Sequence, residues 1–221
     1  MLSYTYKVLM FLEICEEKMV DKSSYKIFDS DAALEWGMLH YGDWLLEMQN
    51  QDNQPQNAIE MFFRNYTQGI HFITNQILRS GVDIEKHCIN SMVKPEMIYG
   101  AISEIKLHLA PENIIVYRYI SKDIVQRMLK WNNLLCFKKG GIVFDKAFLS
   151  TTLTPETVQS RNYSHGYSKL LKIFVPKGTP CLYLDLISDM GENEMLFLPK
   201  TKLRILSSSF LSKTVECIIE D

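Results

Sequence analysis

The sequence lacks the features of a disulfide-linked or metal-stabilised scaffold. Its 221 residues include only 5 cysteines, 10 glycines and 7 prolines, and no two cysteines form a CxxC pair. An odd set of scattered cysteines argues against a disulfide framework and against a structural zinc site, and indicates buried thiols in a reducing compartment. The 5 histidines show no ligand-like spacing, so we expect no metal.

An excess of charge of one sign is also missing. The sequence has 24 lysines and arginines against 26 aspartates and glutamates, a net charge of -2. Nucleic-acid binders usually carry a basic surplus, so we expect no nucleic-acid partner. No apolar run approaches the roughly 18 residues of a membrane span. With 47% hydrophobic residues the chain can nevertheless bury a sizeable core, which excludes wholesale disorder.

The start of the chain contains one short apolar run, from Val8 to Leu12. Glu13, Glu16 and Glu17 follow it, where a secretion signal would have small residues before its cleavage site. We therefore expect an amphipathic helix here rather than a secretion signal. The expected site of action is a cytosol, either that of the producing cell or that of a cell into which the protein is secreted or injected by another route.

The N-terminal half has the periodicity of helices. Apolar residues from Ile59 to Ile77 recur at steps of three and four, which predicts one amphipathic helix, or two helices broken near Gly69, ending at Gly81. Two further helices are predicted, Ala33 to Met48 with Asp31 as the N-cap, and Pro95 to Leu109. The Gln- and Asn-rich segment from Asn50 to Asn57 is predicted to be a loop.

After Pro111 the pattern changes to short β-branched and aromatic runs. The predicted strands are Ile114–Ile120, Ile142–Thr152, Lys169–Val175, Cys181–Leu184, Glu194–Pro199, Leu203–Leu206 and Val215–Ile219. A single helix, from about Asp123 to Trp131, interrupts them. Many short strands with few helices between them are typical of an antiparallel sandwich. We predict one α+β domain over residues 1–221, with a helical lobe (1–110) packed on a β-sandwich lobe (111–221).

An arginine interrupts the first predicted strand. Because side chains alternate along a strand, Arg118 shares a face with Ile114, Val116 and Ile120. Burying a guanidinium without an anion is very costly, so Arg118 needs a carboxylate or a bound phosphate. The residues alone leave two possibilities open, a structural ion pair at a strand end and a phosphate-binding site.

Hydroxyl groups mark a second strand, which ends in Ser150, Thr151 and Thr152. Ser150 and Thr152 point to the same face of that strand. A strand that is simply rich in threonine explains this pattern too, because threonine favours strands. No GxSxG motif is present, so we expect these hydroxyls to position other groups rather than to attack a substrate.

A pair of glutamates, Glu192 and Glu194, precedes an apolar run that ends at Pro199. In an extended conformation both side chains project to the same side. Two carboxylates held together raise the pKa of at least one of them, which is one way to build an acid–base site. The alternative is a solvated pair of acids in a turn.

The order of these three motifs resembles that of the mono-ADP-ribosyltransferases of bacterial toxins, in the Arg–Ser–Glu class. Arg118 stands in VYRY, Ser150 in FLSTT, and Glu192 and Glu194 in GENEMLFLP. The resemblance covers roughly residues 59–206. It implies a helical lobe packed on a β-sandwich, with NAD as co-substrate in the cleft between them.

The resemblance also implies roles for residues of the sheet. Arg118 and Tyr119 would hold NAD, Thr151 and Thr152 would shape the nicotinamide pocket, and Ser150 would orient Glu194. Glu194 would stabilise the sugar cation that forms when nicotinamide leaves. Glu192 would assist the acceptor by taking a proton from an arginine guanidinium.

Further NAD contacts are implied outside these strands. Tyr66, Asn75 and Arg79 resemble the "Y…IN..LR" helix that precedes the catalytic sheet in these toxins, although Tyr66 belongs equally well to the apolar stripe of a packed helix. Arg161 resembles the phosphate-contacting residue of the loop after the serine motif, and a solvent-exposed loop arginine is the alternative.

The acceptor is indicated by the first glutamate of the pair. In this family a glutamate at that position accompanies transfer to arginine, whereas the Rho-targeting exoenzymes, which modify asparagine, carry glutamine there. We therefore expect a monomeric enzyme that modifies arginine on a host or target-cell protein. The turn Ser188–Gly191 lacks the aromatic residue that helps toxins to recognise their substrate. An NAD glycohydrolase and a catalytically silent NAD-binding or protein-interaction module are the alternatives.

Overall fold

The computed structural model describes residues 20–50, 54–81, 83–88, 92–156, 167–188, 190–208 and 213–220. The helix expected around residues 8–12 and the predicted NAD contact Arg161 lie outside these ranges. Cys88, Cys136, Cys181 and Cys217 are free thiols. Of the helices that the structure describes, none combines the length and apolar character needed to cross a membrane.

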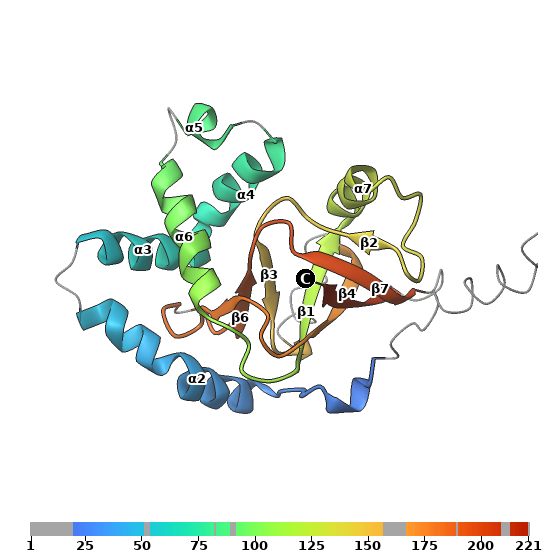
Figure 1. Cartoon of the computed structure of the whole chain (residues 1–221), viewed down its shortest axis with the longest axis horizontal. Helices are drawn as coiled ribbons and strands as arrows, with labels where there is room; N and C mark the ends of the chain where they lie inside the picture. Colours follow the sequence, from blue (N-terminus) through green and yellow to red (C-terminus); the bar gives the residue numbers. More distant parts are fainter. Residues whose placement is uncertain are drawn as a thin grey trace, which may run out of the picture.

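Helices form the first part of the described chain, and those between residues 54 and 107 gather on one side of the sheet (Figure 1). They are η1 (Lys22–Ser24), α2 (Ser30–Asn50), α3 (Gln54–Asn65), η2 (Tyr66–Ile70), α4 (His71–Ser80), α5 (Ile84–His87) and α6 (Pro95–Leu107). Buried aromatic side chains hold α2 in place: the indole N–H groups of Trp36 and Trp44 donate to Glu112 and Glu104 at 2.7 and 2.8 Å. These bonds satisfy the polar ends of two large side chains inside the core.

The break predicted near Gly69 is confirmed. A π-helical turn, η2, joins α3 to α4, and Gly69 has a φ of 139° there. Only glycine adopts that conformation without strain. The predicted end at Gly81 is also confirmed, because Gly81 caps α4 in the left-handed conformation with a φ of 69°.

Two predictions in the helical half are wrong. Asp29, not Asp31, caps α2, because its carboxylate accepts a hydrogen bond from the backbone N–H of Ala32 at 2.8 Å. The loop expected from Asn50 to Asn57 is largely helical, since α2 runs to Asn50 and α3 begins at Gln54. Pro55 is compatible with a helix because it lies in the first turn, where its nitrogen needs no hydrogen-bond partner.

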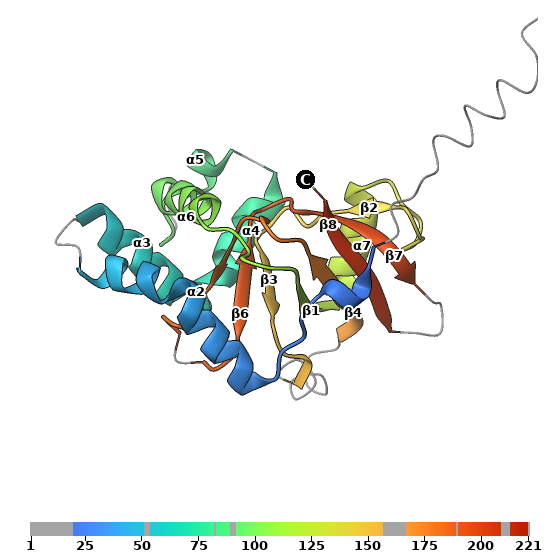
Figure 2. The same cartoon turned by 60° about the horizontal axis from the view of Figure 1, so that its bottom comes forward.

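The sheet follows, in the order β2-β7-β8-β4-β1-β3-β6-β5. Its strands are β1 (Ile114–Ser121), β2 (Ile142–Val143), β3 (Leu149–Thr152), β4 (Tyr167–Val175), β5 (Cys181–Tyr183), β6 (Glu194–Phe197), β7 (Lys202–Ser208) and β8 (Thr214–Glu220). Every pairing is antiparallel except β4 with β8. The sheet is strongly twisted, so β7 and β8 run across the direction of β3 and β6 (Figures 1 and 2). The predicted α+β fold is confirmed.

The long strand predicted from Ile142 to Thr152 is wrong. It consists of β2, at one edge of the sheet, and β3, which lies between β1 and β6. The turn between them carries Asp145, which is buried with 3% of its surface exposed. The segment predicted as one strand therefore contains a turn with a buried acid in it.

Strand β1 has the two faces expected from alternation. Ile114, Val116 and Ile120 belong to the large core, while Ile115 and Tyr117 belong to a smaller cluster on the other face of the sheet. The amphipathic helix α7 (Lys122–Trp131) follows directly, capped by the Ser121 hydroxyl. Arg118 consequently points to the same face as the large core, next to the helices.

Candidate active site

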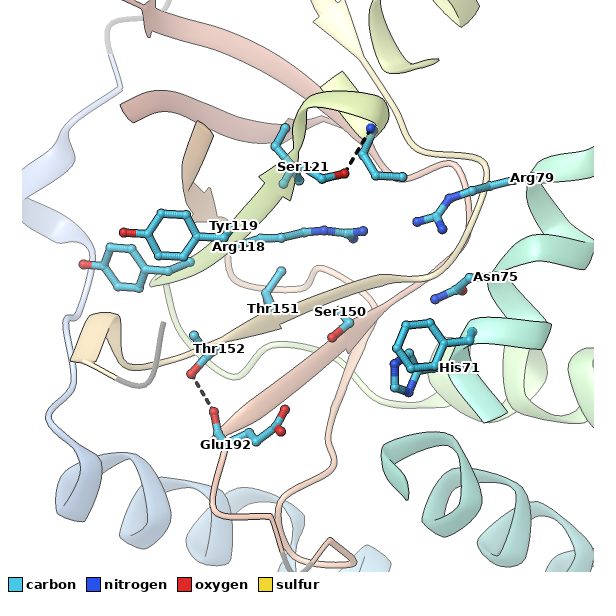
Figure 3. A pocket seen from close by; sticks show the side chains of 14 residues that line it. His71, Asn75, Arg79, Arg118, Tyr119, Ser121, Ser150, Thr151, Thr152 and Glu192 are labelled. Atoms are coloured by element: carbon cyan, nitrogen blue, oxygen red, sulfur yellow. Dashed lines mark hydrogen bonds between the residues drawn. The ribbon is translucent and has the colours of Figure 1, made fainter. Parts of the chain in front are cut away.

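A cavity of about 360 Å³ lies between helix α4 and strands β1 and β3 (Figure 3). Its volume falls in the range of about 300–1,000 Å³ that is typical of small-molecule sites. The predicted site residues that line it are Asn75, Arg79, Arg118, Tyr119, Ser150, Thr151, Thr152 and Glu192. His71, Phe72, Tyr117, Ile120, Ser121 and Ile124 complete its wall.

Strand pairing brings the three sequence motifs together. In β1, Tyr117 pairs with Thr152 of β3, and Thr152 in turn pairs with Glu194 of β6. Three consecutive strands of the sheet therefore carry the arginine, the hydroxyl groups and the catalytic candidate Glu194. Neighbouring strands lie about 4.7–4.9 Å apart, so side chains on one face of them can interact directly.

Glu194 is buried, with 6% of its surface exposed, and accepts a hydrogen bond of 2.5 Å from the hydroxyl of Ser150. Burial raises the pKa of Glu194 to about 7, and the nearby carboxylates of Glu192 and Asp185 add to this effect. The Ser150 hydrogen bond and the charge of Arg118 oppose it. This carboxyl therefore changes its charge near neutral pH.

The extended conformation assumed for Glu192 and Glu194 is wrong. Asn193 between them has a left-handed backbone, with a φ of 49°, and strand β6 begins only at Glu194. Buried hydrogen bonds hold this bend: the hydroxyl of Tyr183 donates to Asn193 Oδ1 at 2.8 Å, and that of Thr152 donates to the carbonyl of Glu192 at 2.6 Å. The bend leaves Glu192 on the cavity wall, as Figure 3 shows.

At the other end of the cavity, Arg79 and Arg118 share the carboxylate of Asp145. Arg79 donates from Nε to Oδ1 at 3.0 Å and from Nη2 to Oδ2 at 2.7 Å. Arg118 donates from Nη2 to Oδ2 at 3.2 Å, and its Nη1 reaches the carbonyl of Phe148 at 3.4 Å. One acid thus links a helix of the first half to a strand of the second.

The three side chains of this cluster are well shielded from water. Their exposed fractions are 1% for Asp145, 13% for Arg118 and 17% for Arg79. Burial raises the pKa of Asp145, but the hydrogen bonds from Arg79 and the two positive charges outweigh it and hold that pKa below its usual range. Burial lowers the pKa of Arg118, and Asp145 opposes that shift. The carboxylate that Arg118 required is therefore Asp145.

Sequence reasoning missed Asp145 although it required a partner for Arg118. The available signal was the charged pair Asp145-Lys146 between apolar residues, with the acid five residues before Ser150. Reading that run as a single strand hid the turn in which the acid is buried.

Of the residues predicted on the helical side, Asn75 and Arg79 line the cavity, whereas Tyr66 does not. Tyr66 is 1% exposed and packs edge-on against Phe148, with ring centroids 5.7 Å apart. Asn75 Nδ2 donates to its hydroxyl at 3.1 Å. Tyr66 thus lies in the core next to the cavity, where it supports Asn75.

Six lining residues had no assigned role, and two of them come from the helical side. His71 and Phe72 begin α4, their ring centroids lie 4.1 Å apart, and Phe72 is 74% exposed. They lie outside the apolar stripe from Ile59 to Ile77, so the periodicity gave them no role.

In the described part of the chain, no group of three or more His, Cys, Asp or Glu side chains could hold a metal ion. The cavity wall carries the guanidinium groups of Arg79 and Arg118 at one end and the carboxyl of Glu192 at the other, whereas Glu194 is buried and is not among the lining residues. Guanidinium groups recognise phosphate, and a carboxylate in a water-poor site stabilises developing positive charge.

Comparison with known proteins shows the family to which the chain belongs. The sequence profile described as ADP-ribosyltransferase exoenzyme matches residues 33–221. A search of curated proteins gave no match. Solved structures with a similar fold include the ADP-ribosyltransferase toxin Plx2a from Paenibacillus larvae, at 20% identity over 88% of this chain and 98% of that one, with a TM-score of 0.63.

Two further structures bear on the ligands. C3stau2 from S. aureus, solved with NAD, is 21% identical over 90% of this chain and 99% of that one, with a TM-score of 0.64. The ADP-ribosyltransferase Vis, solved with agmatine, is 16% identical over 86% and 83%, with a TM-score of 0.59. The family resemblance inferred from the motifs is confirmed by the profile match, which spans both halves of the fold: the chain belongs to the ADP-ribosyltransferase exoenzyme family.

Proposed function

We propose that this chain is a mono-ADP-ribosyltransferase of the Arg–Ser–Glu class, which transfers ADP-ribose from NAD to an arginine side chain of a target protein and releases nicotinamide. The observation that carries this proposal is the 2.5 Å hydrogen bond between Ser150 and Glu194, at a cavity whose other end holds Arg79 and Arg118. We further propose that residues 1–221 act as one catalytic domain.

The cavity suits NAD as the co-substrate. Arg79 and Arg118 lie on its wall and carry the positive charge that two adjacent phosphates require. Asn75 and Tyr119 line the same space and would complete the contacts to NAD, with Thr151 and Thr152 at the nicotinamide end. In support, C3stau2 was solved with NAD.

Glu194 would act on the sugar. Cleavage of the nicotinamide–ribose bond leaves positive charge on the ribose, and an ionised carboxylate nearby stabilises that charge. Ser150 fixes the orientation of the carboxylate through its hydrogen bond, so the group needs no rearrangement as the charge develops. Because the pKa of Glu194 is about 7, the ionised form predominates only above neutral pH.

Glu192 would act on the acceptor. A guanidinium nitrogen forms a bond to C1′ of the ribose while the bond from C1′ to the nicotinamide nitrogen breaks, and the electron pair of that bond leaves with nicotinamide. The proton released by the guanidinium passes to the Glu192 carboxylate on the cavity wall. In support of arginine, the relative Vis was solved with agmatine, which carries the same guanidinium group.

Asp145 would act through the two arginines. It contacts both of them, so it sets their spacing and keeps Arg118 charged inside the protein. Without Asp145 between them, the two guanidinium groups would repel each other. Asp145 is therefore a positioning residue, which connects the helical half of the cavity to the sheet.

The expected partner is a protein of a target cell, and the expected place of action is the cytosol of that cell. The relative Plx2a is a toxin, which supports this inference. We propose that the protein acts as a monomer.

The direct test is incubation of the purified protein with labelled NAD and a cell lysate. The variant Glu194→Gln is tested in parallel, and Glu47→Gln, at an exposed position of α2, is the control. Label in a discrete protein band, absent with Glu194→Gln and removed by hydroxylamine, would support transfer to arginine. Release of nicotinamide without labelled protein would favour the glycohydrolase. Absence of any turnover of NAD would overturn the proposal.

A further inference from the structure

A second cavity, of about 520 Å³, lies against another face of helix α4. It is lined by Ile77, Leu78, Gly81, Ile84, Ile102, Lys106, Lys146, Leu198, Pro199 and Lys200. Neighbouring residues of the chain divide between the two cavities: Arg79 lines the first and Leu78 the second, and Lys146 follows directly on Asp145. None of the residues that line this second cavity belongs to the proposed transferase site.

The floor of this second cavity is apolar and comes from separate parts of the fold. Ile77 and Leu78 belong to α4, Ile102 to α6, and Leu198 with Pro199 to the segment after β6. All of these except Ile77, which is 7% exposed, are only partly buried. A concave apolar floor at the junction of helices and sheet is typical of a small-molecule site.

Three lysines, Lys106, Lys146 and Lys200, stand around this floor. In the described parts of the chain, no carboxylate lies within ion-pair distance of any of them. Lys146 instead lies over the ring of Trp131, with its ammonium 5.2 Å from the ring centre. Three positive charges over an apolar floor attract an anion that also has an apolar body.

We propose that this cavity binds an anionic amphiphile, a molecule with a carboxylate or phosphate head and an apolar chain. The chain would cover the floor formed by α4, α6 and the segment after β6, and the head would lie among the three lysines. Burial of apolar surface and charge-assisted hydrogen bonds would then act together. A fatty acid and an alkyl phosphate are two sources of the same chemistry.

Calorimetric titration of the full chain, without NAD, tests this proposal. The probes are decanoate, decyl phosphate and neutral 1-decanol, which share one chain length and differ in the head. We expect saturable 1:1 binding of at least one anion, and binding about tenfold weaker for the alcohol because it lacks the charged hydrogen bonds. Comparison of the two anions distinguishes the two sources.

A charge-matched pair of variants tests the location. Lys106→Gln with Lys200→Gln should weaken binding of the anion about tenfold or more, while Lys146 is kept because it adjoins Asp145. Lys138→Gln with Lys177→Gln removes the same charge from exposed positions outside the cavity and should leave the affinity unchanged. Fluorescence of Trp131, assigned with Trp131→Phe, should change on binding because Lys146 contacts that ring.

Three results would overturn the proposal: no saturable binding of either anion, equal affinity for the alcohol, or equal weakening in both lysine pairs. Because NAD is absent from the titration, none of these results bears on the transferase activity. Loss of activity in Glu194→Gln would equally leave this site untouched.

Discussion

At one end of the first cavity, Arg79 and Arg118 share the buried carboxylate of Asp145, whereas at the other end Glu194 is buried against the neutral hydroxyl of Ser150. Pairing holds the pKa of Asp145 below its usual range, while burial and neighbouring acids raise the pKa of Glu194 to about 7. At the cationic end, pairing therefore keeps the buried carboxylate charged. The acidic end keeps an unfavourable charge, which is typical of groups that take part in chemistry.

Removal of that charge should have the largest effect on activity. Glu194→Gln keeps the shape of the side chain but cannot stabilise a sugar cation. We expect NAD turnover, measured as release of nicotinamide, to fall by about two to four orders of magnitude. The exposed control Glu47→Gln should turn over NAD at the wild-type rate. Wild-type turnover in Glu194→Gln would contradict the assigned role.

A substitution at the cationic end should lower the free energy of unfolding. Asp145→Asn leaves two largely buried guanidinium groups without a carboxylate, and loss of one partner from a buried ion pair costs about 3–5 kcal/mol. Urea denaturation measures the loss. Asp123→Asn is the matched control, because the exposed pair of Asp123 with Arg127 contributes only about 0.3–0.5 kcal/mol.

A role for Asp145 in positioning the arginines predicts a second change in the same variant. Arg79 and Arg118 would no longer be held together, so the KM for NAD should rise more than kcat falls. Equal stability losses in Asp145→Asn and Asp123→Asn would remove the contrast between the two ends of the cavity.

The two acids of the acidic end should also differ from each other. Glu192 lines the cavity while Glu194 is buried beneath it, so we assign the acceptor to the first and the sugar to the second. Glu192→Gln should lower transfer to agmatine at least about tenfold more than it lowers hydrolysis of NAD, since a general base contributes about 10²–10⁴ to its own step. Parallel losses in the two reactions would show that Glu192 serves the sugar chemistry.

The cationic end shows which part of the site the sequence could predict. Alternation along β1 was sufficient to place Arg118 on the face of the large core, because that pattern depends only on neighbouring residues. Its partners could not be found in this way. Asp145 lies 27 residues from Arg118 and 66 residues from Arg79, so their contact depends on the folded topology.

The acidic end shows a second limit. The side chains of Glu192 and Glu194 were expected to lie together because of an extended backbone, but Asn193 is left-handed. Asparagine tolerates that conformation better than most residues, but the neighbouring sequence did not predict it. The bend is fixed by Tyr183 and Thr152, which lie 10 and 40 residues from the groups that they hold.

The smallest expected effect is a shift in the pH dependence of turnover. The proposed role of Glu194 requires its ionised form, and its pKa is about 7, so turnover should fall as pH decreases below neutrality and level off above it. The Ser150 hydrogen bond lowers this pKa, so Ser150→Ala should move the midpoint to higher pH. The exposed control Ser103→Ala should keep the wild-type profile. A midpoint unchanged in Ser150→Ala would mean that the hydroxyl orients Glu194 without tuning its charge.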